Sequence, residues 1–149
     1  MIKLPYEIID VQPFLYFENE YTVIYFCEKE GYILCIAKAA FIPIDEFMNI
    51  FKKNTELAKT NKFKKFIFDK RSLRAFHQPS MEWYYIEWKQ EVFENGIDKH
   101  YKILPHELWF QRAVEAGKAQ ILKDYPENIL HQVDIRYFDS IKNALEHDA

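Results

Sequence analysis

The chain has 149 residues, the usual size of one domain, with 49% hydrophobic and 29% charged residues, which excludes an intrinsically disordered protein. A formal net charge of -3 lacks the excess of basic residues that a dedicated nucleic-acid binder needs. No apolar run is long enough to span a membrane, and the first residues lack the apolar core of a signal peptide. We therefore expect one cytoplasmic domain over residues 1–149.

The N-terminal part of the chain predicts a β-hairpin. Residues 1–20 hold two short apolar segments that fit either extra strands or an N-terminal extension. Residues 21–27 and 32–38 are rich in β-branched and aromatic side chains, as strands are. Gly31 supplies the turn between these two segments.

The two cysteines lie on opposite arms of this hairpin. In the expected register Cys27 pairs near Tyr32, and Cys35 pairs near Ile24. Successive side chains of a strand point to opposite faces, so the two thiols point away from each other. We expect two free thiols rather than a disulfide.

Three helix-strand units follow the hairpin. Apolar side chains recur at helical spacing in each helix, and each strand is a short apolar run. Helices are predicted over residues 43–60, 79–95 and 106–125, and strands over residues 64–69, 100–104 and 133–138. A short last helix follows, with Asp139 as its N-cap. This alternation predicts parallel strands, so we expect an α/β fold with a mixed sheet, an N-terminal antiparallel hairpin and about four helices.

Four segments together resemble the SpoIIAA-like fold of STAS domains, the sulfate transporter and anti-sigma-factor antagonist family. They are ILCIAKAAFIPIDEF, KKFIFDKRSL, KILP before a helix, and IRYFDSIKNALE, and they span roughly residues 21–146. The resemblance implies a non-enzymatic regulatory module of bacterial signalling that contacts a protein partner or forms a homodimer. The family's phosphorylatable serine follows an acidic residue in a loop before the second helix. Here that loop reads FHQPSM, with neither the acid nor the glycine of the family motif, and Ser80 falls near the phosphosite.

The loop of residues 70–80 is the candidate binding surface. It leaves the C-terminal end of a predicted central strand, where open α/β sheets place ligands. It carries several cationic side chains and precedes a helix N-terminus, which together favour an anion or an acidic partner. The alternative is a solvated loop in which Ser80 only caps the helix. The candidate binding or regulatory residues are Asp69, Lys70, Arg71, Ser72, Arg74, His77, Ser80 and Trp83.

Catalytic and metal sites have little support in the sequence. Asp69 and His77 are the residue types of acid–base chemistry, but they have no identifiable nucleophile. Asp69 is instead expected to accept hydrogen bonds from backbone N–H groups of the following loop. No histidine or cysteine spacing matches a metal site, so neither a metal nor another cofactor is predicted.

The aromatic residues, 17% of the chain, allow two interpretations. Tyr84, Tyr85 and Trp88 lie on the inner stripe of the second helix, whereas Trp83 is expected to be exposed. The aromatic side chains form either an enlarged core or a hydrophobic pocket or homodimer patch. A small hydrophobic ligand or lipid is therefore the second hypothesis, and an enzyme that uses the loop of residues 70–80 is the third.

Overall fold

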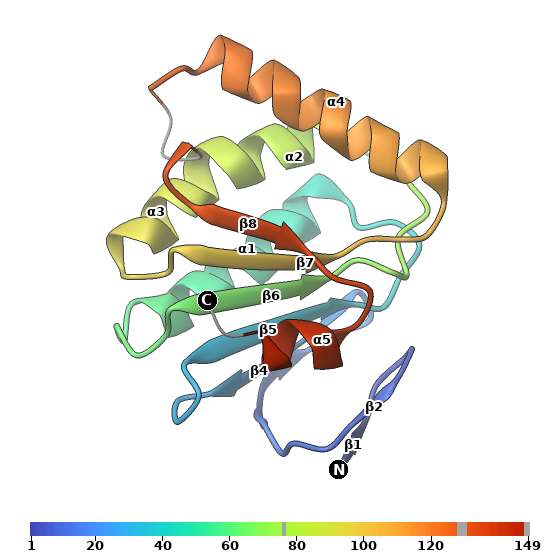
Figure 1. Cartoon of the computed structure of the whole chain (residues 1–149), viewed down its shortest axis with the longest axis vertical. Helices are drawn as coiled ribbons and strands as arrows, with labels where there is room; N and C mark the ends of the chain where they lie inside the picture. Colours follow the sequence, from blue (N-terminus) through green and yellow to red (C-terminus); the bar gives the residue numbers. More distant parts are fainter. Residues whose placement is uncertain (76, 128–130, 148–149) are drawn as a thin grey trace.

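The structure is a computed structural model that describes residues 1–75, 77–127 and 131–147. Its centre is a six-stranded sheet with the strands in sequence order (Figure 1). The second strand is antiparallel to both the first and the third, and the last four strands run parallel. The strands are β3 (Phe14–Glu18), β4 (Thr22–Cys27), β5 (Tyr32–Ala37), β6 (Lys65–Asp69), β7 (Lys99–Ile103) and β8 (Asp134–Tyr137).

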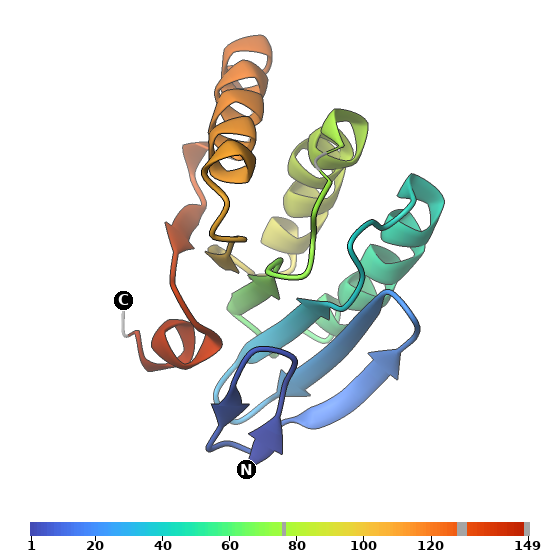
Figure 2. The ribbon, with the colours of Figure 1, turned by 90° about the vertical axis from the view of Figure 1, so that its right-hand side faces the viewer.

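Helices connect the parallel strands and cover one face of the sheet (Figure 2). The other face carries the C-terminal helix and a separate two-stranded hairpin from the N-terminus. The first face has α1 (Ile44–Ala58), the continuous segment α2 (Gln78–Trp83), η1 (Tyr84–Trp88) and α3 (Lys89–Glu94), and α4 (Leu108–Asp124). The second face has α5 (Ile141–Glu146), β1 (Ile2–Lys3) and β2 (Ile8–Ile9).

The sheet is buried on both faces because its central strands alternate between two cores. Phe66 and Phe68 of β6 pack under α1 and α2, whereas Ile67 between them packs beneath β1, β2 and α5. The same alternation along β5 accounts for its near-continuous apolar sequence. The expected α/β fold with a mixed sheet and an N-terminal antiparallel hairpin is confirmed.

The hairpin register is confirmed residue by residue. Cys27 pairs with Tyr32, and Ile24 pairs with Cys35. Both thiols are free, and they lie on opposite faces of the sheet. Gly31 adopts a φ of 73°, the left-handed conformation that glycine tolerates at a turn.

Three details differ from the sequence-based predictions. The second helix contains a π-helical turn, η1, in its middle, which no local signal predicted. The same helix begins at Gln78 with His77 as N-cap, so Ser80 is a helical residue and not the cap. The last helix is capped by Ser140, whose Oγ accepts from Asn143 N, and not by Asp139.

Candidate functional site

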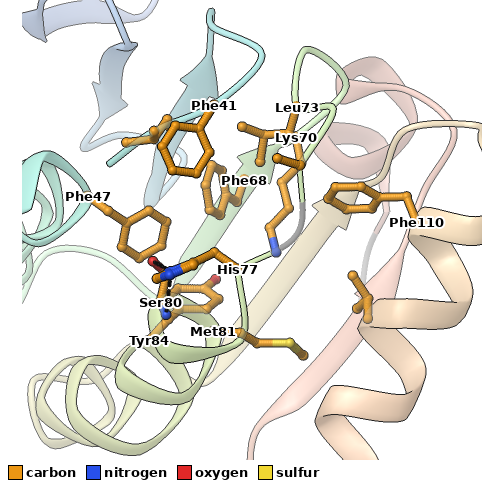
Figure 3. Close-up of a pocket in the computed structure, with 13 residues that line it drawn as sticks. Phe41, Phe47, Phe68, Lys70, Leu73, His77, Ser80, Met81, Tyr84 and Phe110 are labelled. Atoms are coloured by element: carbon orange, nitrogen blue, oxygen red, sulfur yellow. Dashed lines mark hydrogen bonds between the residues drawn. The ribbon is translucent and has the colours of Figure 1, made fainter. Parts of the chain in front are cut away.

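A cavity of about 60 Å³ lies on the helical face, at the C-terminal ends of β5 and β6 (Figure 3). It is bordered by the segment after β5, the loop after β6 and the helices α1, α2 and α4. This is the edge at which parallel sheets usually bind ligands, because the connecting loops leave room there. The lining residues are Phe41, Ile42, Phe47, Phe68, Lys70, Leu73, Ala75, His77, Ser80, Met81, Tyr84, Phe110 and Val114.

The cavity has a buried apolar floor and an exposed mouth. Phe68 and Val114 are each 1% exposed and form part of the floor. Phe41, Ala75 and His77 are exposed and lie at the mouth. The ring of Phe41 meets the imidazole of His77 edge-on at 6.5 Å between ring centroids.

Lys70 places an amine inside this apolar cavity. Its side chain is 8% exposed, and Nζ lies 5.1 Å from the ring centre of Phe68 and 5.4 Å from that of Tyr84. Among the residues that the structure describes, no carboxylate lies within ion-pair distance of this amine and no acceptor is hydrogen-bonded to it. Burial lowers the pKa of Lys70 to about 8, because the charged ammonium loses its hydration.

A second polar atom of the cavity also lacks a partner. Tyr84 is 1% exposed, and within the described part of the chain its hydroxyl makes no hydrogen bond. Figure 3 shows the Lys70 amine and the Tyr84 hydroxyl directed into the same space. An unpaired buried hydroxyl costs about 1–3 kcal/mol, so the site holds two groups that a ligand oxygen would satisfy.

Two further amines are buried behind Tyr84, away from the cavity. Lys89 Nζ lies 2.8 Å from His100 Nδ1, and Lys102 Nζ donates to the Tyr85 hydroxyl. Both amines also lie over the aromatic rings of Tyr84 and Tyr85, at 4.2 to 5.1 Å from the ring centres. Burial first, and the neighbouring amines second, hold the pKa of Lys89 and of Lys102 well below the usual value. The amines therefore tend to be neutral and act as hydrogen-bonding groups.

Asp69 and Arg71 face the opposite side of the sheet and do not join the cavity. Asp69 accepts from the backbone N–H of Arg71 at 3.0 Å, which confirms its predicted contact with the loop backbone. The guanidinium of Arg71 also binds both Asp69 oxygens and reaches Glu7 Oε1 at 2.7 Å. Glu7 in turn accepts from the backbone N–H of Ile141 at the start of α5. Asp69 and Arg71 therefore hold the N-terminal hairpin against the sheet. The guanidinium of Arg71 is already occupied by two carboxylates and is not available to bind an anion.

The remaining candidate residues, Ser72, Arg74 and Trp83, do not line the cavity. Arg74 is exposed, donates to the carbonyls of Arg71 and Leu73, and pairs with Glu107 at 3.5 Å. Ser72 is half-buried and does not line the cavity. Trp83 was expected to be exposed but is half-buried, because its ring packs edge-on against Phe47 at 6.1 Å.

His77 and Ser80 are in contact with each other at the cavity wall. His77 Nδ1 lies 2.8 Å from Ser80 Oγ and accepts from the Ser80 backbone N–H at 3.3 Å. Ser80 is 7% exposed, so a kinase would reach its hydroxyl only after this loop opens. Asp69 and His77 have different partners on different faces of the sheet, so the acid–base pair considered from the sequence does not form. Phe76, in the same loop, lies outside the described residues.

The described part of the chain contains no cluster of histidine, cysteine or carboxylate side chains that could bind a metal ion. Nor is any of its helices both long and apolar enough to cross a membrane. No protein family, no curated protein and no solved structure matches the chain. The resemblance to STAS domains therefore stays a prediction.

Sequence reasoning located part of the site and missed part of it. Lys70, His77 and Ser80 were named as candidates and do line the cavity. Tyr84 was expected in the core, but its position in the cavity lining was not foreseen. Phe41 and Phe110 were also missed, because no local pattern shows that segments so far apart border one cavity.

Proposed function

We propose that the protein is a binding module for a small apolar ligand that carries one oxygen-bearing head group. The observation that supports this proposal is the apolar cavity, which holds the amine of Lys70 beside two aromatic rings and the unpaired hydroxyl of Tyr84. Apolar pockets with a few converging polar groups are the usual form of small-molecule sites. The apolar body would lie against Phe68 and Phe110, and the head group would meet the two polar atoms.

The volume of the cavity limits how many atoms of the ligand it can enclose. An engineered cavity of about 150 Å³ holds benzene in another protein, so the 60 Å³ here admits a head group and only a few carbon atoms. A longer ligand would extend past the exposed side chains of Phe41 and His77 at the mouth. Four-carbon probes therefore fill the enclosed part of the site and extend into its mouth.

The test is a methyl NMR titration with butanol and with butyrate. We expect both probes to shift the methyl signals of Leu73, Met81 and Val114, which line the cavity. Ala75→Phe fills the mouth and should abolish these shifts. Ala116→Phe adds the same side chain at an exposed site of α4 outside the cavity and should leave them intact. Unchanged cavity signals at millimolar probe would refute the proposal.

The second candidate is the protein-contact role that the STAS-like resemblance implies, as a regulatory module without enzymatic activity. The observation that favours it is the exposed edge strand β3, where Phe14 is 67% exposed, Leu15 58% and Tyr16 37%. An apolar edge strand can pair with a second copy of the same strand. Light scattering tests it, with a dimer expected for the unmodified chain and a monomer for Leu15→Lys.

A further inference from the structure

The protonation state of the Lys70 amine indicates which chemical class of head group the proposed ligand carries. The inference rests on the small-ligand binding proposed above. Nζ of Lys70 is enclosed by aromatic rings on two sides and lies in a cavity where no described carboxylate pairs with it. An ammonium group in such surroundings loses most of its hydration and gains no counter-charge, so a larger fraction of Lys70 is uncharged than of an exposed lysine.

Two neighbouring lysines also disfavour a proton on Lys70. Lys89 and Lys102 are close enough that positive charge on Lys70 lowers their pKa. The same repulsion disfavours a proton on Lys70 whenever either of them is charged. Cys35 acts in the opposite direction, but burial raises the pKa of its thiol to about 12, so it carries no negative charge at neutral pH. Asp69 is held on the other face by Arg71.

We propose that Lys70 captures small apolar aldehydes or ketones as an imine. The carbonyl oxygen would accept a hydrogen bond from the unpaired hydroxyl of Tyr84 while the carbonyl carbon lies against Nζ of Lys70. A carbonyl, unlike a carboxylate, can condense with the free amine, and it brings no second charge into a cavity whose walls are otherwise apolar.

The step is balanced by the groups at the site. The lone pair of Nζ forms a C–N bond, the carbonyl π pair moves to oxygen, and one N–H proton follows it to give a carbinolamine. The hydroxyl then leaves with the second N–H proton as water, and a C=N bond remains. Nothing is oxidised or reduced. His77 lines the same cavity, where its Nδ1 lies 2.8 Å from Ser80 Oγ.

The amount of free amine sets the expected rate. With a pKa of about 8, roughly a tenth of Lys70 is unprotonated at pH 7, about 300-fold more than for a lysine with an unshifted pKa. Nucleophilic lysines of other proteins are activated in this way. The confined entrance offsets part of this gain, so we expect at least about a tenfold preference for Lys70 over an exposed lysine such as Lys59.

The experiment uses butanal with cyanoborohydride, which reduces any imine to a stable butylamine, on the full chain at pH 7. Peptide mass mapping over time should show butylation of Lys70 at least about tenfold faster than of Lys59. Lys70→Arg should remove the fast phase, and Lys59→Arg, an exposed control, should leave it. Butanol, which has the same carbon chain without a carbonyl, should slow the labelling by occupying the cavity.

The outcomes separate the two proposals. If butanol shifts the cavity methyl signals but Lys70 reacts no faster than Lys59, the imine proposal is overturned and the binding proposal stands. If Lys70 reacts fast but no probe shifts the cavity signals, both proposals are overturned, because the fast reaction then does not take place in a cavity that binds the probe. If neither result appears, both are overturned.

Discussion

Replacing Lys70 by methionine should change how stability depends on pH. The folded pKa of Lys70 is about 8 against an ordinary value of 10.5, so the unfolded chain binds more protons between these two values. Stability then rises with pH through this window and is lowest below pH 8. Each pKa unit corresponds to about 1.4 kcal/mol, so a charged Lys70 costs the fold about 3 kcal/mol at pH 7.

Methionine has a similar length and no charge to bury, so Lys70→Met should stabilise the protein by about 2–3 kcal/mol at pH 7. At pH 10.5 less than about 0.5 kcal/mol of this advantage should remain, because Lys70 is then neutral in the folded state and only half protonated in the unfolded chain. Urea unfolding of both proteins at several pH values between 7 and 10.5 measures the difference. Tyr84 and Tyr85, whose pKa burial raises well above 10, destabilise the fold above pH 10 in both proteins and cancel in the comparison.

Lys59→Met is the matched control, because Lys59 is exposed and its substitution should give a difference that does not vary with pH. A stability difference between Lys70→Met and the unmodified chain that is the same at pH 7 and pH 10.5 would show that the amine is not desolvated. The argument for a reactive Lys70 would then lose its physical basis.

Three further predictions concern the buried side chains of Arg71, Trp88 and Cys35. Arg71→Met leaves the carboxylate of Asp69 buried and unpaired, so we expect a loss of about 3–5 kcal/mol in urea unfolding, against little change for the exposed Arg136→Met. Trp88→Phe removes the indole N–H that donates to Phe51 O at 3.0 Å, and should cost about 1–3 kcal/mol by the same measurement. Cys35, with a pKa of about 12, should react with a thiol reagent at pH 8 only as fast as the chain unfolds, whereas equal rates for Cys35 and the half-buried Cys27 would contradict its burial.

The alternation of side chains along strands and the helical spacing of apolar residues predicted the fold well. The alternation along residues 21–38, with a single glycine at the turn, was enough to place Cys35 opposite Ile24. The helix of residues 78–94 was found from its apolar stripe, but its π-helical turn was not, because that turn has no sequence pattern of its own.

The candidate site was predicted less well, because it depends on contacts between distant segments. Arg71 looked like an anion ligand until the structure placed Glu7, 64 residues away, against its guanidinium. Lys89 and Lys102 were missed because lysine is almost always exposed. One signal was available, since His100 and Lys102 share one face of a strand that the order of elements placed inside the sheet.

The most direct test of the proposed function is to detect contacts between butanol and the cavity by intermolecular nuclear Overhauser effects. We predict effects from the butanol chain to the methyl groups of Met81 and Val114, and their loss in Ala75→Phe. Effects confined to exposed side chains such as Trp109, or none at all, would contradict the central claim that this cavity binds small apolar ligands.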